Sequence, residues 1–168
     1  WAVAEVSPLL VSGIRYIIAV LPAIFFVRRP QVALPLLVLY GLFVGVGQFG
    51  FLFSAIKLGM PAGLASLVVQ VQAFVTIGLA VLFLGERPSR TALIGALIAF
   101  AGIGVIAIER LQAAALLPLL MTLAAAVSWG FANLVTKKAG KIDMLGFVVW
   151  SSLVPPLPLF ALSAVVDG

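Results

Sequence analysis

The chain has 168 residues, of which 64% are hydrophobic and only 9% are charged, and its mean hydropathy is +1.32. A soluble globular domain of this length needs a polar surface that this composition cannot supply, so that class is excluded. The net charge is +5, but the basic residues are scattered between apolar segments and form no face for nucleic acid. The chain has no cysteine, which leaves its redox compartment open.

Six apolar segments follow one another along the chain, and each is long enough to cross a bilayer as a helix of about 20 residues. They cover residues 8–27, 33–56, 61–84, 91–108, 116–136 and 144–166. Charged or proline-containing breaks separate them. The sequence therefore predicts an all-α, polytopic membrane protein with about six transmembrane helices.

The basic residues are distributed unevenly between the connections. Three alternate connections contain seven of them: Arg28, Arg29, Arg87, Arg90, Lys137, Lys138 and Lys141. The opposite connections contain only Lys57 and Arg110. Because short cytoplasmic loops are enriched in Lys and Arg, the first set is predicted to face the cytoplasm. Residues 1–7 and Asp167 are then expected outside.

The second segment contains GVGQFG at residues 45–50, which matches the G-x-G-x-x-G dinucleotide fingerprint. That fingerprint needs a preceding strand and an acidic residue about 20 positions later, and neither is expected here. We therefore interpret the glycines as packing residues. Gly41 and Gly45 form a G-x-x-x-G pair with Gln48 on the same face.

The third segment contains two glutamines, Gln70 and Gln72, near its middle. On a regular helix they lie roughly 160° apart, at either edge of a stripe of small residues. The stripe consists of Ala62, Ser66, Ala73, Thr76 and Ala80. The opposite, lipid-facing side is predicted to contain Leu64, Val68, Val71, Val75 and Leu82. Each glutamine either faces a polar path or bonds a neighbouring helix.

Other segments contribute further candidates. Trp129 and Asn133 lie four residues apart on a small, polar face of the fifth segment, which indicates either a cavity lining or tight packing. Arg15 lies within the first segment, where it either serves function or extends towards the membrane surface. The fourth segment has Gly95, Ala99 and Gly102 on one face, which favours helix packing.

The middle of each span lacks acidic residues and histidine, so an intramembrane proton relay is not predicted in this stretch. No catalytic constellation, metal-ligand cluster, phosphate loop or cofactor motif is found, and an enzyme is not predicted. The prolines Pro155, Pro156 and Pro158 are expected to break the last span. The carbonyls that they free must be satisfied by protein or by a water-filled cavity.

Two stretches, GMPAGLASLVVQVQAF and FLGERPSRTALIGALIAFAGIGVIAI, resemble the EamA family of the drug/metabolite transporter superfamily. The run TLAAAVSWGFANLVTKK resembles the start of the second repeat of that family. Within the family, the chain looks most similar to the exporters of cysteine and O-acetylserine. The resemblance implies ten helices in two inverted five-helix repeats. Residues 1–110 would then be helices two to five of the first repeat, and residues 111–168 helices six and seven; the remaining helices would be missing.

The resemblance implies an exporter of small amino-acid metabolites in the bacterial cytoplasmic membrane, working by alternating access. Two alternatives stay open, an ion-coupled exporter of drugs or other metabolites and a non-transporting scaffold subunit. Candidates for the substrate path are Arg15, Gln48, Gln70, Gln72, Trp129 and Asn133. Expected partners are the lipid bilayer, a small polar or zwitterionic metabolite and, as an open alternative, a second copy in a homodimer. No nucleic acid, metal or cofactor is expected.

Overall fold

The computed structural model describes residues 8–110 and 115–166, and every regular element within these ranges is a helix. The elements are α2 (Pro8–Ile24), α3 (Leu34–Gly41), η1 (Leu42–Gly50), α4 (Phe51–Lys57), α5 (Ala62–Val69), α6 (Gln72–Leu84), α7 (Arg90–Arg110), α8 (Leu116–Ala139), α9 (Met144–Ser151) and α10 (Pro156–Val166).

These elements form the predicted membrane-crossing segments. Among the described residues, four helices are long and apolar enough to span a membrane, namely Leu34–Lys57, Ala62–Leu84, Leu116–Ala139 and Met144–Ala164. Two shorter apolar helices, Leu9–Ile24 and Arg90–Val105, match the first and fourth predicted spans. The prediction of an all-α, polytopic membrane protein is confirmed.

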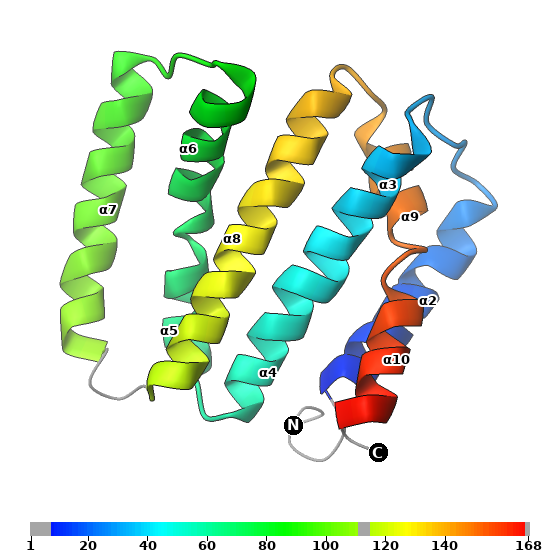
Figure 1. Cartoon of the computed structure of the whole chain (residues 1–168), viewed down its shortest axis with the longest axis horizontal. Helices are drawn as coiled ribbons and strands as arrows, with labels where there is room; N and C mark the ends of the chain where they lie inside the picture. Colours follow the sequence, from blue (N-terminus) through cyan, green and yellow to red (C-terminus); the bar gives the residue numbers. More distant parts are fainter. Residues whose placement is uncertain (1–7, 111–114, 167–168) are drawn as a thin grey trace.

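The helices stand side by side in a row that runs from α7 through α5–α6 and α8 to α3–α4 and then to α2 with α9–α10 (Figure 1). The α2–α3, α6–α7 and α8–α9 connections lie at the same end of the helices, which we call the basic end. The seven basic residues lie in these connections or in the adjoining helix turns. That this end faces the cytoplasm stays a prediction. The expectation for residues 1–7 and Asp167 lies outside the described residues.

Helix α8 is the centre of the row and packs against α6, η1, α4, α3 and α5. It can do so because small residues, Ala125, Ala126, Gly130 and Ala132, are buried along it. A Cβ built at Gly130 would lie 2.6 Å from Val75 Cγ1, so the backbones of α6 and α8 approach closely there. Other large apolar side chains of α8, such as Leu116, Leu117 and Leu120, are exposed, as suits contact with lipid.

The third span is interrupted at Gln70 and Val71, between α5 and α6. The Gln70 N–H bonds the Leu67 carbonyl at 3.1 Å, and the Ala73 N–H bonds the Gln70 carbonyl at 3.1 Å. These three-residue spacings belong to a tight 3₁₀ turn rather than to an α-helix. The two halves of the span therefore do not follow one helical wheel.

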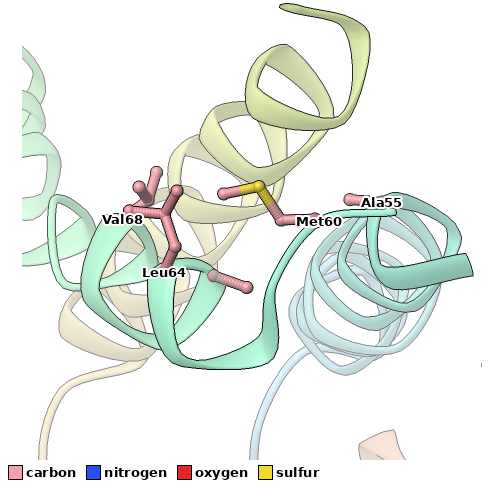
Figure 2. Close-up of a cluster of buried hydrophobic side chains, with 5 residues drawn as sticks. Ala55, Met60, Leu64 and Val68 are labelled. Carbon is pink, nitrogen blue, oxygen red and sulfur yellow. The ribbon is translucent and has the colours of Figure 1, made fainter. Parts of the chain in front are cut away.

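The predicted lipid-facing side of this span is wrong at Leu64, Val68 and Val75, and Val75 of α6 lies against Gly130 of α8. Leu64 and Val68 are only 5% and 6% exposed, and they pack with Ala55 and Met60 in a buried cluster (Figure 2). Leu82, in α6, is 78% exposed, as expected. A single 100° projection over residues 61–84 therefore fails, because α5 turns its large residues towards α4 and α8.

The second span contains a π-helix, η1, over the GVGQFG stretch. The side chain of Ser128 on α8 donates to the Phe43 carbonyl at 2.9 Å, where the α-helical pattern has been lost. A Cβ built at Gly45 would overlap the Pro155 ring, and one at Gly41 would overlap the Ser151 carbonyl. This segment therefore lies in close contact with α8 on one side and with the α9–α10 break on the other.

Helix α7 is the outermost helix of the row, on the side away from α2 (Figure 1). Phe100 makes an edge-to-face contact with Phe74, with ring centroids 5.3 Å apart. Gly95, Ala99 and Gly102 are exposed, and nothing lies within 4 Å of a Cβ built at either glycine. The packing predicted for these three residues is therefore not made within the described part of the chain, because α7 presents a different face to its neighbours.

The contact between Gly45 and Pro155 gives a test of the fold. Gly45→Ala places a methyl group where the proline ring lies, and overpacking of this kind costs roughly 1–3 kcal/mol. Gly78→Ala is the matched control, because a Cβ at Gly78 meets open space. Thermal unfolding in detergent should show a lower midpoint for the first variant and an unchanged or higher one for the second. Equal midpoints would argue against the close contact.

Candidate functional site

Two polar clusters lie inside the row of helices, and the first joins α6 to α8. Asn133 Nδ2 donates to Gln72 Oε1 at 2.9 Å and to Thr76 Oγ1 at 3.1 Å. Thr76 Oγ1 in turn donates to the Gln72 carbonyl at 2.7 Å. We call these three residues the amide cluster. Its members are bonded mainly to one another, so it holds the two helices together.

The two glutamines of the third span have different environments. Gln72 belongs to the amide cluster, whereas Gln70 is exposed at the interruption between α5 and α6. The structure thus gives Gln72 the interhelical role that sequence reasoning left open between the two. From the sequence, Thr76 was assigned only to the small-residue stripe. Its hydroxyl lies one helical turn after Gln72, and that spacing could have indicated that the two residues share a polar cluster.

An ion pair adds a contact between the same two parts of the chain at the basic end of the helices. Lys137 Nζ and Glu86 Oε2 are 2.5 Å apart, with side chains 39% and 46% exposed. Exposed pairs of this kind contribute about 0–1 kcal/mol. The pair therefore adds little to the stability of the contact between α8 and the α6–α7 connection.

The second polar cluster surrounds a cavity of about 220 Å³ on the side of the row formed by α2, α3 and α9–α10. We call it the Arg15 cavity. It is lined by Arg15, Tyr16, Tyr40, Gly41, Val44, Gly45, Phe49, Val148, Ser151, Ser152 and Pro155. These residues come from α2, α3, η1, α9 and the α9–α10 break. Arg15, Gly45 and Pro155 lie near the middle of their spans, which indicates that part of the cavity lies well within the membrane.

Arg15 is positioned in this cavity by aromatic rings. Its guanidinium carbon lies 4.2 Å from the centroid of the Phe49 ring and 5.6 Å from that of Tyr16. Such cation–π contacts stabilise a cation most where water is scarce. The ion pair found in the described residues is between Lys137 and Glu86, and no carboxylate pairs with Arg15 there. The positive charge at the cavity is thus not neutralised by these residues.

The Tyr16 hydroxyl adds a second polar group. It is buried and has no hydrogen-bond partner among the described residues, which is unfavourable unless another molecule supplies one. The serine hydroxyls are already engaged, because Ser151 Oγ donates to the Phe147 carbonyl at 2.6 Å and Ser152 Oγ to the Val148 carbonyl at 2.7 Å. The carbonyl of Ser152, in contrast, cannot receive the usual bond from residue 156, since proline has no N–H.

The remaining candidates lie apart from this cavity lining. Gln48 is buried on η1, at 5% exposure, and Trp129 is partly buried on α8. Sequence reasoning identified Arg15 but missed its surroundings: Tyr16, Tyr40, Phe49 and Ser152. The available signals were an arginine near the middle of a span and the Pro155-Pro156 pair. Among the described residues, no group of acidic residues, histidines and cysteines could hold a metal ion.

Known proteins resemble this chain closely. A model of the EamA-like transporter family matches residues 1–108. A "Probable amino-acid metabolite efflux pump" of Escherichia coli (strain K12) is 45% identical over 98% of this chain and 57% of its own length. A protein of the same name from Salmonella typhimurium is 46% identical over the same shares.

A more distant relative is a "Probable terminal-alkyne amino-acid exporter" of Streptantibioticus cattleyicolor, 32% identical over 98% of this chain and 55% of its own length. The chain therefore spans a little over half the length of these relatives. No solved structure matches it significantly.

The amide cluster predicts a measurable contribution to stability. Asn133→Ala removes two hydrogen bonds between α6 and α8. Interhelical hydrogen bonds in membranes contribute about 0.6 kcal/mol each on average and about 1.7 kcal/mol at most. Gln70→Ala is the control, because that amide is exposed at the helix interruption. The unfolding midpoint in detergent should fall for Asn133→Ala and stay near the wild-type value for Gln70→Ala. The reverse order would contradict the assigned roles.

Proposed function

This chain belongs to the EamA-like transporter family, and we propose that it takes part in the export of small amino-acid metabolites, binding their carboxylate in the Arg15 cavity. The family points to transport rather than catalysis. The relatives' names refer to amino-acid metabolites and an amino acid, which have a carboxylate in common. Cysteine and O-acetylserine are the solutes that the sequence resemblance implies.

The observation that carries the proposal is the Arg15 cation, which lines the cavity and has no carboxylate partner among the described residues. A guanidinium does not lose its proton and presents N–H groups that match the two oxygens of a carboxylate. The ring of Phe49 holds Arg15 without occupying those N–H groups. The Tyr16 hydroxyl is available as a further donor to an anionic group beside it.

The same cavity offers an acceptor for the amino group of a zwitterion. Ser152 lines the cavity, and we propose its carbonyl, which Pro156 cannot hydrogen-bond, as the acceptor for a solute ammonium. The described residues place no carboxylate at the cavity, so the ammonium is bound by dipoles rather than by a full charge. Binding of this strength suits a transporter, which must release its solute.

The size of the cavity favours a small metabolite over a drug. Drug-sized ligands occupy sites of about 300–1,000 Å³. The Arg15 cavity has about 220 Å³ and therefore fits a small amino acid better. An ion-coupled drug exporter of the same fold, the alternative, would also need a carboxylate within the membrane. The described carboxylates with assigned roles, Glu86 and Asp143, lie at helix ends instead.

The other candidates take supporting places in this proposal. Gln72 and Asn133 hold α6 against α8, whereas Gln48, Gln70 and Trp129 are proposed as uncharged groups further along the path. The basic loops are proposed to face the cytoplasm, in the inner membrane of a bacterium. Residues 1–110 and 111–168 are proposed to belong to two inverted repeats that alternate in access. A homodimer stays a prediction.

Efflux measurements test this proposal. Cells that express the reading frame containing this chain should export labelled cysteine and O-acetylserine faster than empty-vector cells. Arg15→Gln keeps hydrogen-bonding groups but removes the charge. The loss of a charge-assisted bond, about 1.5–3 kcal/mol, should lower efflux roughly 10- to 100-fold. Arg15→Lys should be affected less, because it keeps the charge but not the planar fork.

The matched control is Arg87→Gln, which removes one cation from a loop and should leave efflux near the wild-type rate. Membrane levels of each variant are compared by immunoblot. Normal efflux by Arg15→Gln, at equal membrane levels, would remove Arg15 from the substrate site. No efflux of either solute by the wild-type protein would overturn the proposed substrate class.

A further inference from the structure

A second hollow lies at the basic end of the helices, between the α2–α3 connection and the start of α9. It has a volume of about 270 Å³ and is lined by Arg28, Arg29, Pro30, Gln31, Lys141, Ile142 and Asp143. The proposed transport path does not use it. Its lining comes from two segments more than 100 residues apart in sequence, which meet at the same end of the helices (Figure 1).

Specific contacts hold the two segments together. Trp150 Nε1 on α9 donates to the Val27 carbonyl at 3.1 Å. A Cβ built at Gly146 would lie 2.9 Å from the Arg28 carbonyl, so only a residue without a side chain fits there. The arginines and Lys141 are therefore brought together by packing, and not only by the general enrichment of basic residues in such loops.

The hollow has a positive charge that its own carboxylate does not cancel. Three cations and one carboxylate line it, which leaves a net charge of +2. Asp143 caps α9, because its oxygens accept the N–H groups of Leu145 and Gly146, each at 3.1 Å. Arg28, Arg29 and Lys141 are exposed, and the described residues provide no ion-pair partner for them.

An apolar surface adjoins these cations. Phe25 and Phe26 directly precede the arginines and are 81% and 88% exposed. Both follow the last turn of α2, so they lie where a membrane span reaches the headgroup region. A ligand that satisfies both surfaces has an anionic head and an apolar tail.

We propose that this hollow binds the headgroup of an anionic phospholipid, with its phosphate among Arg28, Arg29 and Lys141 and its acyl chains along Phe25 and Phe26. Basic pockets between transmembrane helices bind anionic headgroups in this way. The guanidinium groups suit a phosphate, because they donate pairs of hydrogen bonds to its oxygens. A free phosphate shares the head chemistry but has no use for the two phenylalanines.

Native mass spectrometry of the protein purified from the reading frame containing this chain tests this inference. The protein is mixed with equal amounts of phosphatidylglycerol and phosphatidylcholine in detergent, and bound lipids are counted. With three cations at the site, the first phosphatidylglycerol should bind on the order of tenfold more tightly than phosphatidylcholine. The triple variant Arg28→Gln, Arg29→Gln and Lys141→Gln should lose this preference.

The control variant Arg87→Gln, Arg90→Gln and Lys138→Gln removes three cations from the same end of the row and should keep the preference. Equal binding of both lipids by the wild-type protein would overturn the site, whatever the variants do. Equal loss in both triple variants would show diffuse charge attraction instead. Displacement of the lipid by soluble glycerol phosphate would show that the hollow takes free anions and would refute the lipid assignment.

Discussion

The close contact between η1 and the α9–α10 break is the constraint on which the rest of this structure depends. In hydrocarbon, an irregular backbone survives only where protein or trapped water satisfies its polar groups. Here two irregular segments from different spans lie against each other at Gly45 and Pro155. Ser128 on α8 bonds the Phe43 carbonyl at 2.9 Å on another side of η1. The departures from regular helix are therefore concentrated where neighbouring helices compensate for them, and the Arg15 cavity opens beside them.

The two polar clusters illustrate how similar side chains can take different roles in a membrane. In the amide cluster, the Asn133 amide donates to the Gln72 side chain and to the Thr76 hydroxyl, and that hydroxyl donates to the Gln72 backbone carbonyl. Two of these bonds cross between the helices, so the cluster acts as an attachment between α6 and α8. In the Arg15 cavity, a cation and the Tyr16 hydroxyl adjoin open volume. A ligand gains most where polar groups are still unpaired, so the cavity is the better candidate for binding.

The position of each irregularity also decided which sequence predictions succeeded. Hydropathy alone gave the right span boundaries to within a few residues, since hydropathy over 18 or more residues depends little on local geometry. Helical periodicity was used only to assign faces. The same periodicity misplaced Leu64 and Val68, which are buried. The interruption at Gln70 and Val71 has no proline or glycine to mark it. The wheel was also read with the large residues facing lipid, whereas Leu64, Val68 and Val75 pack against protein.

Sequence by itself determined the class of protein, its spans and the alternation of basic loops, because these follow from composition and from the cost of placing charge and free backbone groups in hydrocarbon. It also identified Arg15 as a candidate functional residue, because placing a charge within a membrane span is costly. Only the tertiary structure decided that Gln72 rather than Gln70 meets Asn133, and that Arg15 lies over Phe49 beside a cavity. These are contacts between residues at least 34 positions apart. They depend on which helices become neighbours, and that is set by the packing of glycine, proline and small side chains rather than by any local pattern.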